Sequence, residues 1–248
     1  MAGSPGRRRI SSTSSSAPST EAGQRRRVLY GRRHGPKLRA TRRGALDDIL
    51  PKVAIDLGGD APLDPQALFE GPARPIWLEI GFGGGEHLTA QAAAHPEVGF
   101  IGVEPFINGV SSLLVQVERS GARNVRVLVD DARLLLDRLP DASVDRAFVL
   151  FPDPWPKVRH HKRRIVNPAT AAALARVLRP GAELRIASDD PDYVRWILAT
   201  MLAERGFAWT AERPSDWRNR PSDGVQTRYE EKALRAGRTP VFMGFRRV

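Results

Sequence analysis

From residue 75 onward, short apolar runs alternate with segments that have helical spacing, and this alternation decides the fold class. It is typical of an open α/β sheet whose strands are mostly parallel. We therefore expect a Rossmann-like α/β fold with seven strands and helices on both faces of the sheet. One of these helices is expected at Pro168–Leu178, ended by the turn Arg179-Pro180-Gly181. The expected strands are Ile76–Ile80, Val98–Glu104, Val125–Val129, Arg146–Phe151, Glu183–Ala187, Phe207–Ala211 and Val241–Arg246.

An acidic residue lies at or just beyond the end of each of the first five strands. Ligands of open α/β sheets bind beyond the carboxyl ends of the strands, so these side chains should meet at one edge. Five acids at the same edge indicate a binding site rather than a need for solubility. They are Glu79, Glu104, Asp131, Asp153 and Asp189.

The loop after the first strand is rich in glycine, with Gly81, Gly83 and Gly85 in alternation. Glycines let a ligand approach the backbone closely, but this motif alone is weak evidence. The spacing is one residue short of the Gly-x-Gly-x-x-Gly pattern of dinucleotide-binding folds. Glu79 beside the loop would repel a phosphate, and the loop carries no basic residue. A nicotinamide dinucleotide is therefore disfavoured, although it and a purely structural turn remain alternatives.

A cationic ligand suits these acids better. S-adenosylmethionine carries a sulfonium and an ammonium group, its ribose diol would sit on Glu104, and Asp131 with Ala132 suits the adenine. We expect this methyl donor as the cofactor.

The stretch from Leu150 to Arg164 combines an acid, a large aromatic side chain and a basic run. Three prolines at alternate positions from Pro152 prevent it from continuing as a strand or a helix, so Asp153 and Trp155 should sit on a stiff loop. A solvated charge run is the plain alternative. The acid, aromatic and basic groups together favour a polyanion that presents a flat base. The basic run comprises Lys157, Arg159, His160, His161, Lys162, Arg163 and Arg164.

The string Pro-Asp-Pro-Trp-Pro-Lys followed by Arg-His-His-Lys-Arg-Arg-Ile-Val resembles the signature of the bacterial tRNA (guanine-N7-)-methyltransferases. The resemblance extends from about Tyr30 to Val248 and includes the segment Gly31-Arg32-Arg33-His34-Gly35. It implies the S-adenosylmethionine-dependent methyltransferase form of the fold and methyl transfer to N7 of a guanine in the tRNA variable loop. It departs from the family pattern at Gly84, at Asp190 and at Arg228-Tyr229.

The resemblance also implies roles for individual residues. Glu79, Glu104, Asp131 and Asp153 match positions that contact the cofactor, and Lys157, Asp189, Thr227, Arg228, Tyr229 and Glu230 match tRNA-substrate positions. We also expect Gly81 and Gly83 to bind the cofactor, because glycines let a ligand approach the backbone closely. Thr227 and Glu230 equally fit a capping box at the start of a helix. We expect Arg159, His160, Lys162, Arg163 and Arg164 to contact the RNA. No third metal ligand stands at helical spacing from the two histidines, so no metal is expected.

Guanine N7 has an in-plane lone pair and no proton, so its methylation needs no general base. The reaction needs in-line approach and a place for the positive charge that develops on the purine. Asp153 is the expected catalytic residue, and Trp155 either stacks on the base or only supports the loop.

Composition sets the remaining expectations. Residues 1–43 hold twelve Lys and Arg against one acid, a net charge of +11, whereas residues 44–248 are neutral overall. We expect a basic, disordered or extended tail at 1–43, disordered over Met1 to Gln24, and a methyltransferase domain at 44–248. The absence of cysteine and of a long apolar run fits a cytoplasmic protein without a membrane segment. We expect a monomer or a homodimer, between which the sequence does not decide. Three rival functions stay open: an S-adenosylmethionine enzyme with a small substrate, a non-catalytic RNA-binding subunit, and a nicotinamide oxidoreductase, which Glu79 and the glycine spacing disfavour.

Overall fold

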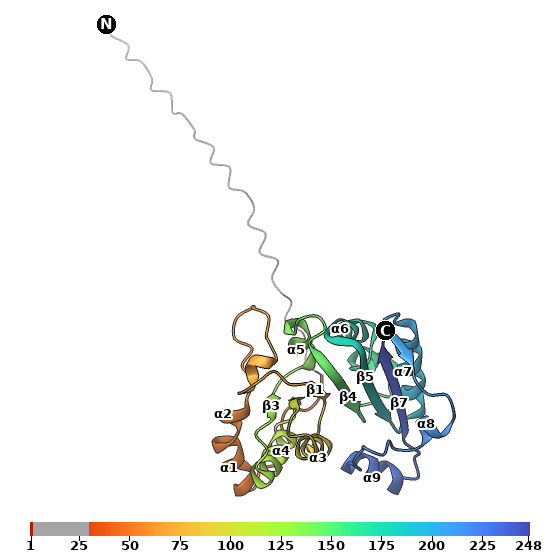
Figure 1. Cartoon of the computed structure of the whole chain (residues 1–248), viewed down its shortest axis with the longest axis horizontal. Coiled ribbons are helices and arrows are strands. Elements are labelled where there is room, and N and C mark those ends of the chain that lie inside the picture. Colours follow the sequence, from red (N-terminus) through yellow and green to blue (C-terminus); the bar gives the residue numbers. More distant parts are fainter. Residues whose placement is uncertain (2–29) are drawn as a thin grey trace.

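A seven-stranded sheet in the order β3-β2-β1-β4-β5-β7-β6 forms the centre of the computed structural model, which describes residues 1 and 30–248 (Figure 1). Strands β1 to β5 pair in parallel, and β7 runs antiparallel to β5 and β6. This confirms the expected Rossmann-like, mostly parallel sheet. The strands are β1 (Ile76–Ile80), β2 (Gly99–Val103), β3 (Val125–Leu128), β4 (Val144–Leu150), β5 (Leu178–Ser188), β6 (Phe207–Trp209) and β7 (Val241–Arg247).

Helices cover both faces of the sheet, as expected. Apolar side chains of α1, α3 and α4 form one cluster with β1 to β3, and those of α5, α6 and α7 form a second cluster on the opposite face. The longer helices are α1 (Ala40–Asp48), α3 (Glu86–Ala94), α4 (Ile107–Ser120), α5 (Ala132–Arg138), α6 (Pro168–Val177), α7 (Pro191–Ala203) and α9 (Arg228–Arg235). Short turns of helix are α2 (Leu50–Val53), η1 (Gln66–Leu68), η2 (Val158–Arg163) and α8 (Ser215–Arg218).

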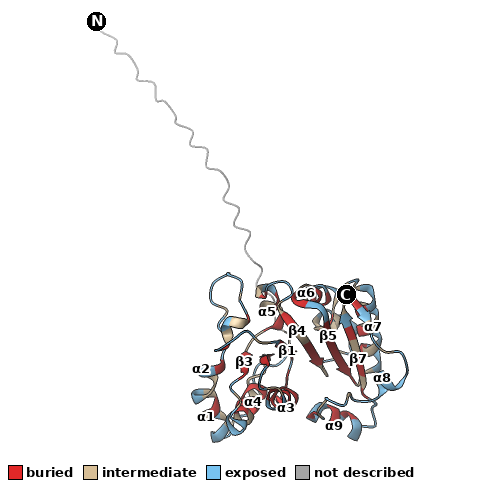
Figure 2. Cartoon of the chain, viewed as in Figure 1, coloured by how far each residue is buried: buried red, intermediate tan, exposed pale blue. Residues whose placement is uncertain are grey.

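Burial follows the position of each strand in the sheet. All five residues of β2 are buried, as expected for a parallel strand covered on both faces, whereas the edge strand β6 has one buried residue, Phe207. Figure 2 shows the buried residues concentrated in the centre of the sheet and on the helix sides that face it. Helix α4 contributes fully buried Leu113 and Leu114 to the face that it shares with α3. The packed sheet therefore holds the strand ends in fixed relative positions.

Helix α6 and strand β5 differ from the expectation. The helix ends at Val177, one residue early, and β5 already begins at Leu178 rather than at Glu183. Leu178 pairs with Val144 of β4, and the register shifts between Val144 and Arg146. This long-range pairing with β4 extends the strand through the Pro180-Gly181 turn, which local sequence signals assign to a loop.

The disorder predicted for Met1 to Gln24 lies outside the described residues, apart from Met1. Residues 30–36, which belong to the predicted tail, lie against the body of the molecule. The Ile107 N–H donates to the Arg33 carbonyl at 2.9 Å, and Arg33 pairs with Asp130 at 2.9 Å. Helix α1 then begins at Ala40, before the predicted domain boundary at residue 43.

Among the described residues, no helix is long and apolar enough to cross a membrane.

Candidate active site

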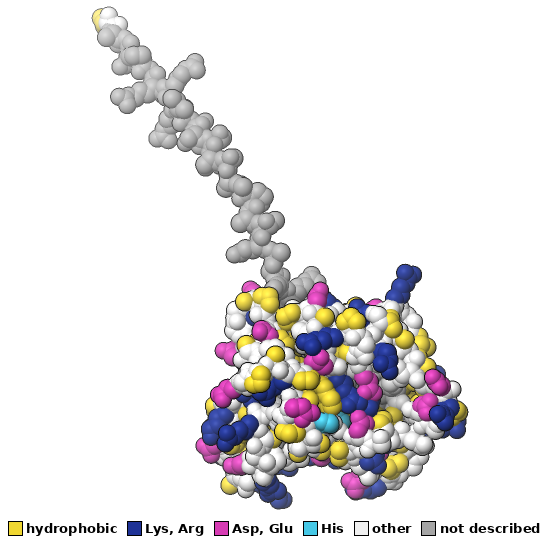
Figure 3. Space-filling model, viewed as in Figure 1, with side chains coloured by type: hydrophobic (Ala, Val, Ile, Leu, Met, Phe, Trp, Pro, Cys, Tyr) yellow, Lys and Arg dark blue, Asp and Glu magenta, His cyan; other side chains and the backbone are white. Residues whose placement is uncertain are grey.

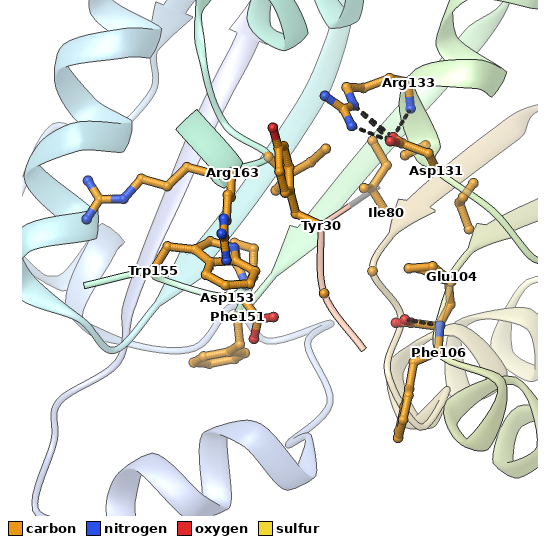
Figure 4. Close-up of a pocket in the computed structure, with 18 of the residues that line it drawn as sticks. Tyr30, Ile80, Glu104, Phe106, Asp131, Arg133, Phe151, Asp153, Trp155 and Arg163 are labelled. Atoms are coloured by element: carbon orange, nitrogen blue, oxygen red, sulfur yellow. Dashed lines mark hydrogen bonds and ion pairs between the residues drawn. The ribbon is translucent and has the colours of Figure 1, made fainter. Parts of the chain in front are cut away.

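A cavity of about 320 Å³ opens at the carboxyl ends of the central strands, and we call it the rim cavity. Its volume falls in the range of small-molecule sites. Figure 4 shows Glu104 and Asp131 on one side of it and Asp153, Trp155 and Arg163 on the other, with Tyr30 between them. The structure thus brings three of the five expected strand-end acids into one cavity, together with Gly81.

Glu104 is held rigidly at the end of β2. One of its carboxylate oxygens accepts from the Gly83 N–H at 2.8 Å and the other from the Phe106 N–H at 2.9 Å. Burial raises the pKa of this carboxyl against the two hydrogen bonds, and the charges of Asp153 and Glu79 add to the increase. Each oxygen keeps a lone pair, so the side chain can still accept from ligand hydroxyls.

Asp131 caps the start of α5 at the same rim. It accepts from the Arg133 N–H at 2.9 Å, and the Arg133 guanidinium forms a fork onto both of its oxygens (Figure 4). The buried carboxylate is therefore neutralised by a neighbour that also lines the cavity. Sequence patterns did not single out Arg133.

The proline loop after β4 presents Asp153 at the open side of the cavity. Phe151 and Trp155 adopt positive φ angles of 53° and 47°, an uncommon conformation for bulky residues. Asp153 is exposed at the mouth, yet partial burial of its carboxyl raises its pKa. No described residue donates a hydrogen bond to it, so a strained loop holds a free carboxylate toward the cavity.

Tyr30, Arg163 and Trp155 form a stack in the rim cavity. The Arg163 guanidinium lies 5.2 Å from the centre of the Tyr30 ring and 4.9 Å from that of Trp155. The Nε atom of Arg163 is buried and has no hydrogen-bond partner among the described residues. Tyr30 was not expected in the site; its only signal was its place beside the Gly-Arg-Arg-x-Gly segment.

Glu79 lies beneath the rim cavity rather than in its lining. Its carboxylate is 2.8 Å from His87 Nδ1, and both side chains are almost fully buried. The His87 ring packs edge-on against Phe148. Glu79 therefore adds negative charge near Glu104 from outside the cavity lining, and its direct contact with the cofactor stays a prediction.

The segment expected to bind tRNA closes over the glycine loop. The Thr227 hydroxyl accepts from the Glu230 N–H at 3.2 Å and caps α9, and Glu230 is buried against Arg220. Tyr229 packs on Gly83, where a Cβ atom would approach the ring to 2.5 Å. Arg228 fills the space above Gly84 and binds Glu86, so the glycine that departs from the family pattern accommodates the arginine that also departs from it.

The residues of the basic run differ in their exposure to solvent. Lys157, Arg159 and Lys162 are exposed, as an RNA contact requires, and partial burial together with neighbouring cations lowers the pKa of His160. Arg164, in contrast, is only 1% exposed. Its Nε donates to the Pro154 carbonyl at 2.9 Å, and its guanidinium binds Asp192 at 2.5 Å.

The expected RNA contact by Arg164 is therefore corrected to a structural role, because its guanidinium is enclosed while it anchors the proline loop. Asp189 lies outside the rim cavity and binds Arg238 at 2.6 Å, and its substrate role stays a prediction. Among the described residues, no three His, Asp or Glu side chains gather as a metal site would need.

Comparisons with known proteins agree on one family. A family model described as "Putative methyltransferase" matches residues 73–243. The tRNA (guanine-N(7)-)-methyltransferase of Rhodospirillum rubrum is 55% identical over 222 residues, 88% of this chain and 87% of that protein. The enzyme of the same name from Ruegeria pomeroyi is 52% identical over 229 residues, 90% of this chain and 95% of that protein. The solved 16S rRNA methyltransferase KamB superposes with a TM-score of 0.52 at 16% identity, covering 74% of this chain and 91% of that one, which supports the fold alone.

Proposed function

Since this chain belongs to the tRNA (guanine-N(7)-)-methyltransferase family, we propose that it transfers a methyl group from S-adenosylmethionine to N7 of a guanine in the tRNA variable loop. The observation that carries the proposal is the rim cavity, in which Glu104 and Asp131 face Asp153 across a single space (Figure 4).

The rim cavity fits the methyl donor. When bound, S-adenosylmethionine supplies an electrophilic methyl group on a sulfonium. Glu104 would accept from the ribose hydroxyls, because its position is fixed by two backbone N–H groups and both oxygens keep free lone pairs. Asp131 would accept from the adenine amino group, beside the apolar surface of Ala132. The carboxylates, including buried Glu79 below, favour a cation over a phosphate.

Asp153 is the proposed catalytic residue. As N7 bonds to the methyl group and the bond from that methyl group to the sulfonium sulfur breaks, positive charge passes from the sulfur to the guanine. A fixed carboxylate beside the purine stabilises that charge. The proline loop, braced by Arg164, holds Asp153 in place before the substrate arrives. The same carboxylate can accept hydrogen bonds from the N1/N2 edge of guanine, so it both orients the base and stabilises the product cation.

Trp155 supports the loop in this arrangement. It is half-buried, and its ring contacts His160 edge-on and Arg163 through its face. We propose that Arg163 and the exposed cations beside it hold the RNA backbone, while the guanine enters between Asp153 and the cofactor.

The decisive experiment is incubation with labelled S-adenosylmethionine and unmodified tRNA, followed by mapping of the methylated nucleotide. A tRNA with 7-deazaguanosine at the mapped position is the matched control, because it lacks N7 and should accept no label. Methyl transfer that ignores added tRNA would favour the small-substrate enzyme. Binding of tRNA without any binding of the methyl donor would favour the non-catalytic subunit.

A further inference from the structure

A second cavity, of about 450 Å³, lies beside the rim cavity, and we call it the basic cavity. Phe106 and Tyr229 line both cavities, so the two share a wall. No acidic side chain is among the residues that line the basic cavity in the described part of the chain. Its lining instead includes four cations, Lys37, Arg39, Arg42 and Arg228.

Few carboxylates in the described part of the chain compensate these cations. Within residues 30–248, Lys37, Arg39 and Arg42 form no ion pair, and Arg42 is half-buried, so water solvates it incompletely. Only Arg228 has a carboxylate partner, Glu86. In Figure 3, dark blue side chains gather at the lower left, over the place that α1 takes in Figure 1. Like charges held around one cavity repel one another, and a bound anion would relieve that repulsion.

The backbone immediately before these cations is held against the core. The Asn108 side chain at the start of α4 accepts from the Gly35 N–H at 2.7 Å and donates to the Pro36 carbonyl at 2.8 Å. These bonds hold the chain immediately before Lys37. Binding therefore does not have to order this stretch of backbone, which lowers its entropic cost. Both α1 and α4 begin at this cavity, and their N-terminal dipoles favour an anion further.

We propose that the basic cavity binds a backbone phosphate of the tRNA, close to the guanosine that enters the rim cavity. This inference rests on the proposed function, which makes RNA the substrate. Phosphate is the anion that every nucleotide carries, and arginine binds it through two parallel N–H donors. Such contacts set the position of a nucleic acid without reading its sequence. The shared wall at Tyr229 places this anchor next to the reacting site.

The first test is the double variant R39Q/R42Q, compared with R119Q/R205Q. The control removes the same charge from two exposed arginines that line neither cavity. We expect R39Q/R42Q to bind tRNA at least about tenfold more weakly, with a log–log salt dependence shallower by about 0.7–0.9 for each lost phosphate contact. Its affinity for S-adenosylmethionine and its melting temperature should match those of the control.

Two outcomes of this test would overturn the proposal. Equal tRNA affinity and salt dependence in both variants would mean that the cavity holds no phosphate. A selective loss of S-adenosylmethionine affinity in R39Q/R42Q would mean that the cavity serves the carboxylate of the cofactor instead.

The second test locates the phosphate on the RNA. Ligated tRNAs carry a single neutral methylphosphonate at successive positions around the target guanosine. A methylphosphonate at one or two positions within a few nucleotides of the target should weaken tRNA binding by the wild-type enzyme. The same methylphosphonate should cause no further loss of binding by R39Q/R42Q. Such non-additivity is the signature of a direct pair. Equal losses with both proteins at every position would contradict the proposal. Methylation of unmodified tRNA is followed in parallel and tests the proposed function separately. The enzyme can methylate tRNA even if the effects of the methylphosphonates and of R39Q/R42Q on binding add at every position.

Discussion

Glu104 and Asp131 each accept hydrogen bonds from protein donors, whereas no described residue donates one to Asp153. The first two carboxylates are therefore positioned for a ligand that arrives with its own hydroxyl or amino donors. Asp153 has its full hydrogen-bonding capacity free and a pKa raised by burial. Among the three acids of the rim cavity, it is the one suited to a charge that appears only during the reaction.

We predict that Asp153→Asn lowers the single-turnover rate of methyl transfer by on the order of 10²–10³, because it removes one fixed electrostatic contact and keeps the side-chain shape. The rate would be measured at saturating tRNA and methyl donor, so that weaker binding is not mistaken for slower chemistry. Asp56→Asn, a change at an exposed residue outside the rim cavity, is the control. Near-normal turnover by Asp153→Asn would refute the role of this carboxylate.

As the pH falls, binding of the cationic methyl donor should weaken at a higher pH than it would if the carboxyl groups of the site had ordinary pKa values. Burial raises the pKa values of Glu104 and Asp153, so both become neutral at a higher pH than exposed carboxyls. Affinity should rise with pH through this window and level off above it. The sign for stability is opposite: without ligand, a raised carboxyl pKa makes the fold lose stability as pH rises from the unfolded pKa to the folded one.

Calorimetric titration with S-adenosylmethionine between pH 5 and pH 8, at about half-unit steps, checks this dependence. Glu104→Gln should bind more weakly and show a flatter pH profile. An unchanged profile in that variant would assign the titration to another group.

Single residues also mark the limit of sequence reasoning. The acids at the strand ends were predictable, because a parallel sheet brings the carboxyl ends of its strands to one edge. The burial of Arg164 was not, since its neighbours in the basic run are exposed and only the tertiary contacts with Pro154 and Asp192 separate it from them. The position of Tyr30 in the rim cavity was also not predictable, because it depends on long-range packing against Arg163 and not on a local sequence pattern.

At the level of the elements, the glycine loop and α9 pack closely against each other. Gly83 has a φ of 55° and lies under Tyr229, so a side chain there is excluded twice, by conformation and by space. Gly84 differs, because only the flexible end of Arg228 occupies the place of its missing side chain. Substitutions at the two glycines should therefore have different consequences.

We predict that Gly84→Ala weakens tRNA binding by displacing Arg228 from Glu86, and that it adds almost nothing in an Arg228→Ala background. Two residues that share one space are expected to be non-additive in this way. Gly83→Ala should be damaging in every background, since truncating Tyr229 does not remove the positive φ. Affinities for tRNA and unfolding free energies of the four variants in the cycle check the claim. Full additivity of Gly84→Ala and Arg228→Ala would contradict it.

Element boundaries were predictable where local signals acted alone. The Thr-x-x-Glu pattern correctly indicated a helix start, because the Thr227 hydroxyl caps α9 in the structure. The start of β5 was misplaced, because pairing of Leu178 with Val144 extends the strand through a turn-like Pro-Gly pair. The basic run forms the short helix η2 rather than an extended loop, which its charges alone did not indicate.

For the molecule as a whole, charge and architecture divide the N-terminal region into two parts. The excess positive charge of the chain lies entirely within residues 1–43. Residues 30–32 line the rim cavity. The segment 30–36 is attached to the body through Tyr30 with Arg163, Arg33 with Asp130 and with the Ile107 N–H, and Gly35-Pro36 with Asn108. This segment connects the rim cavity to the basic cavity, whereas residues 2–29 lie outside the described residues.

Two truncations should therefore behave differently. Deletion of residues 2–29 removes six arginines and one acid, so we expect modestly weaker tRNA binding with a shallower salt dependence and unchanged affinity for S-adenosylmethionine. Deletion of residues 2–38 also removes Tyr30 and the attachments at Asp130 and Asn108, so affinity for the methyl donor should fall as well. Titrations of both ligands against both truncated proteins, at several salt concentrations, separate the two effects. If the shorter deletion leaves the salt dependence unchanged, the tail makes no contact with tRNA; if the longer one leaves cofactor binding intact, residues 30–36 play no part in closing the rim cavity.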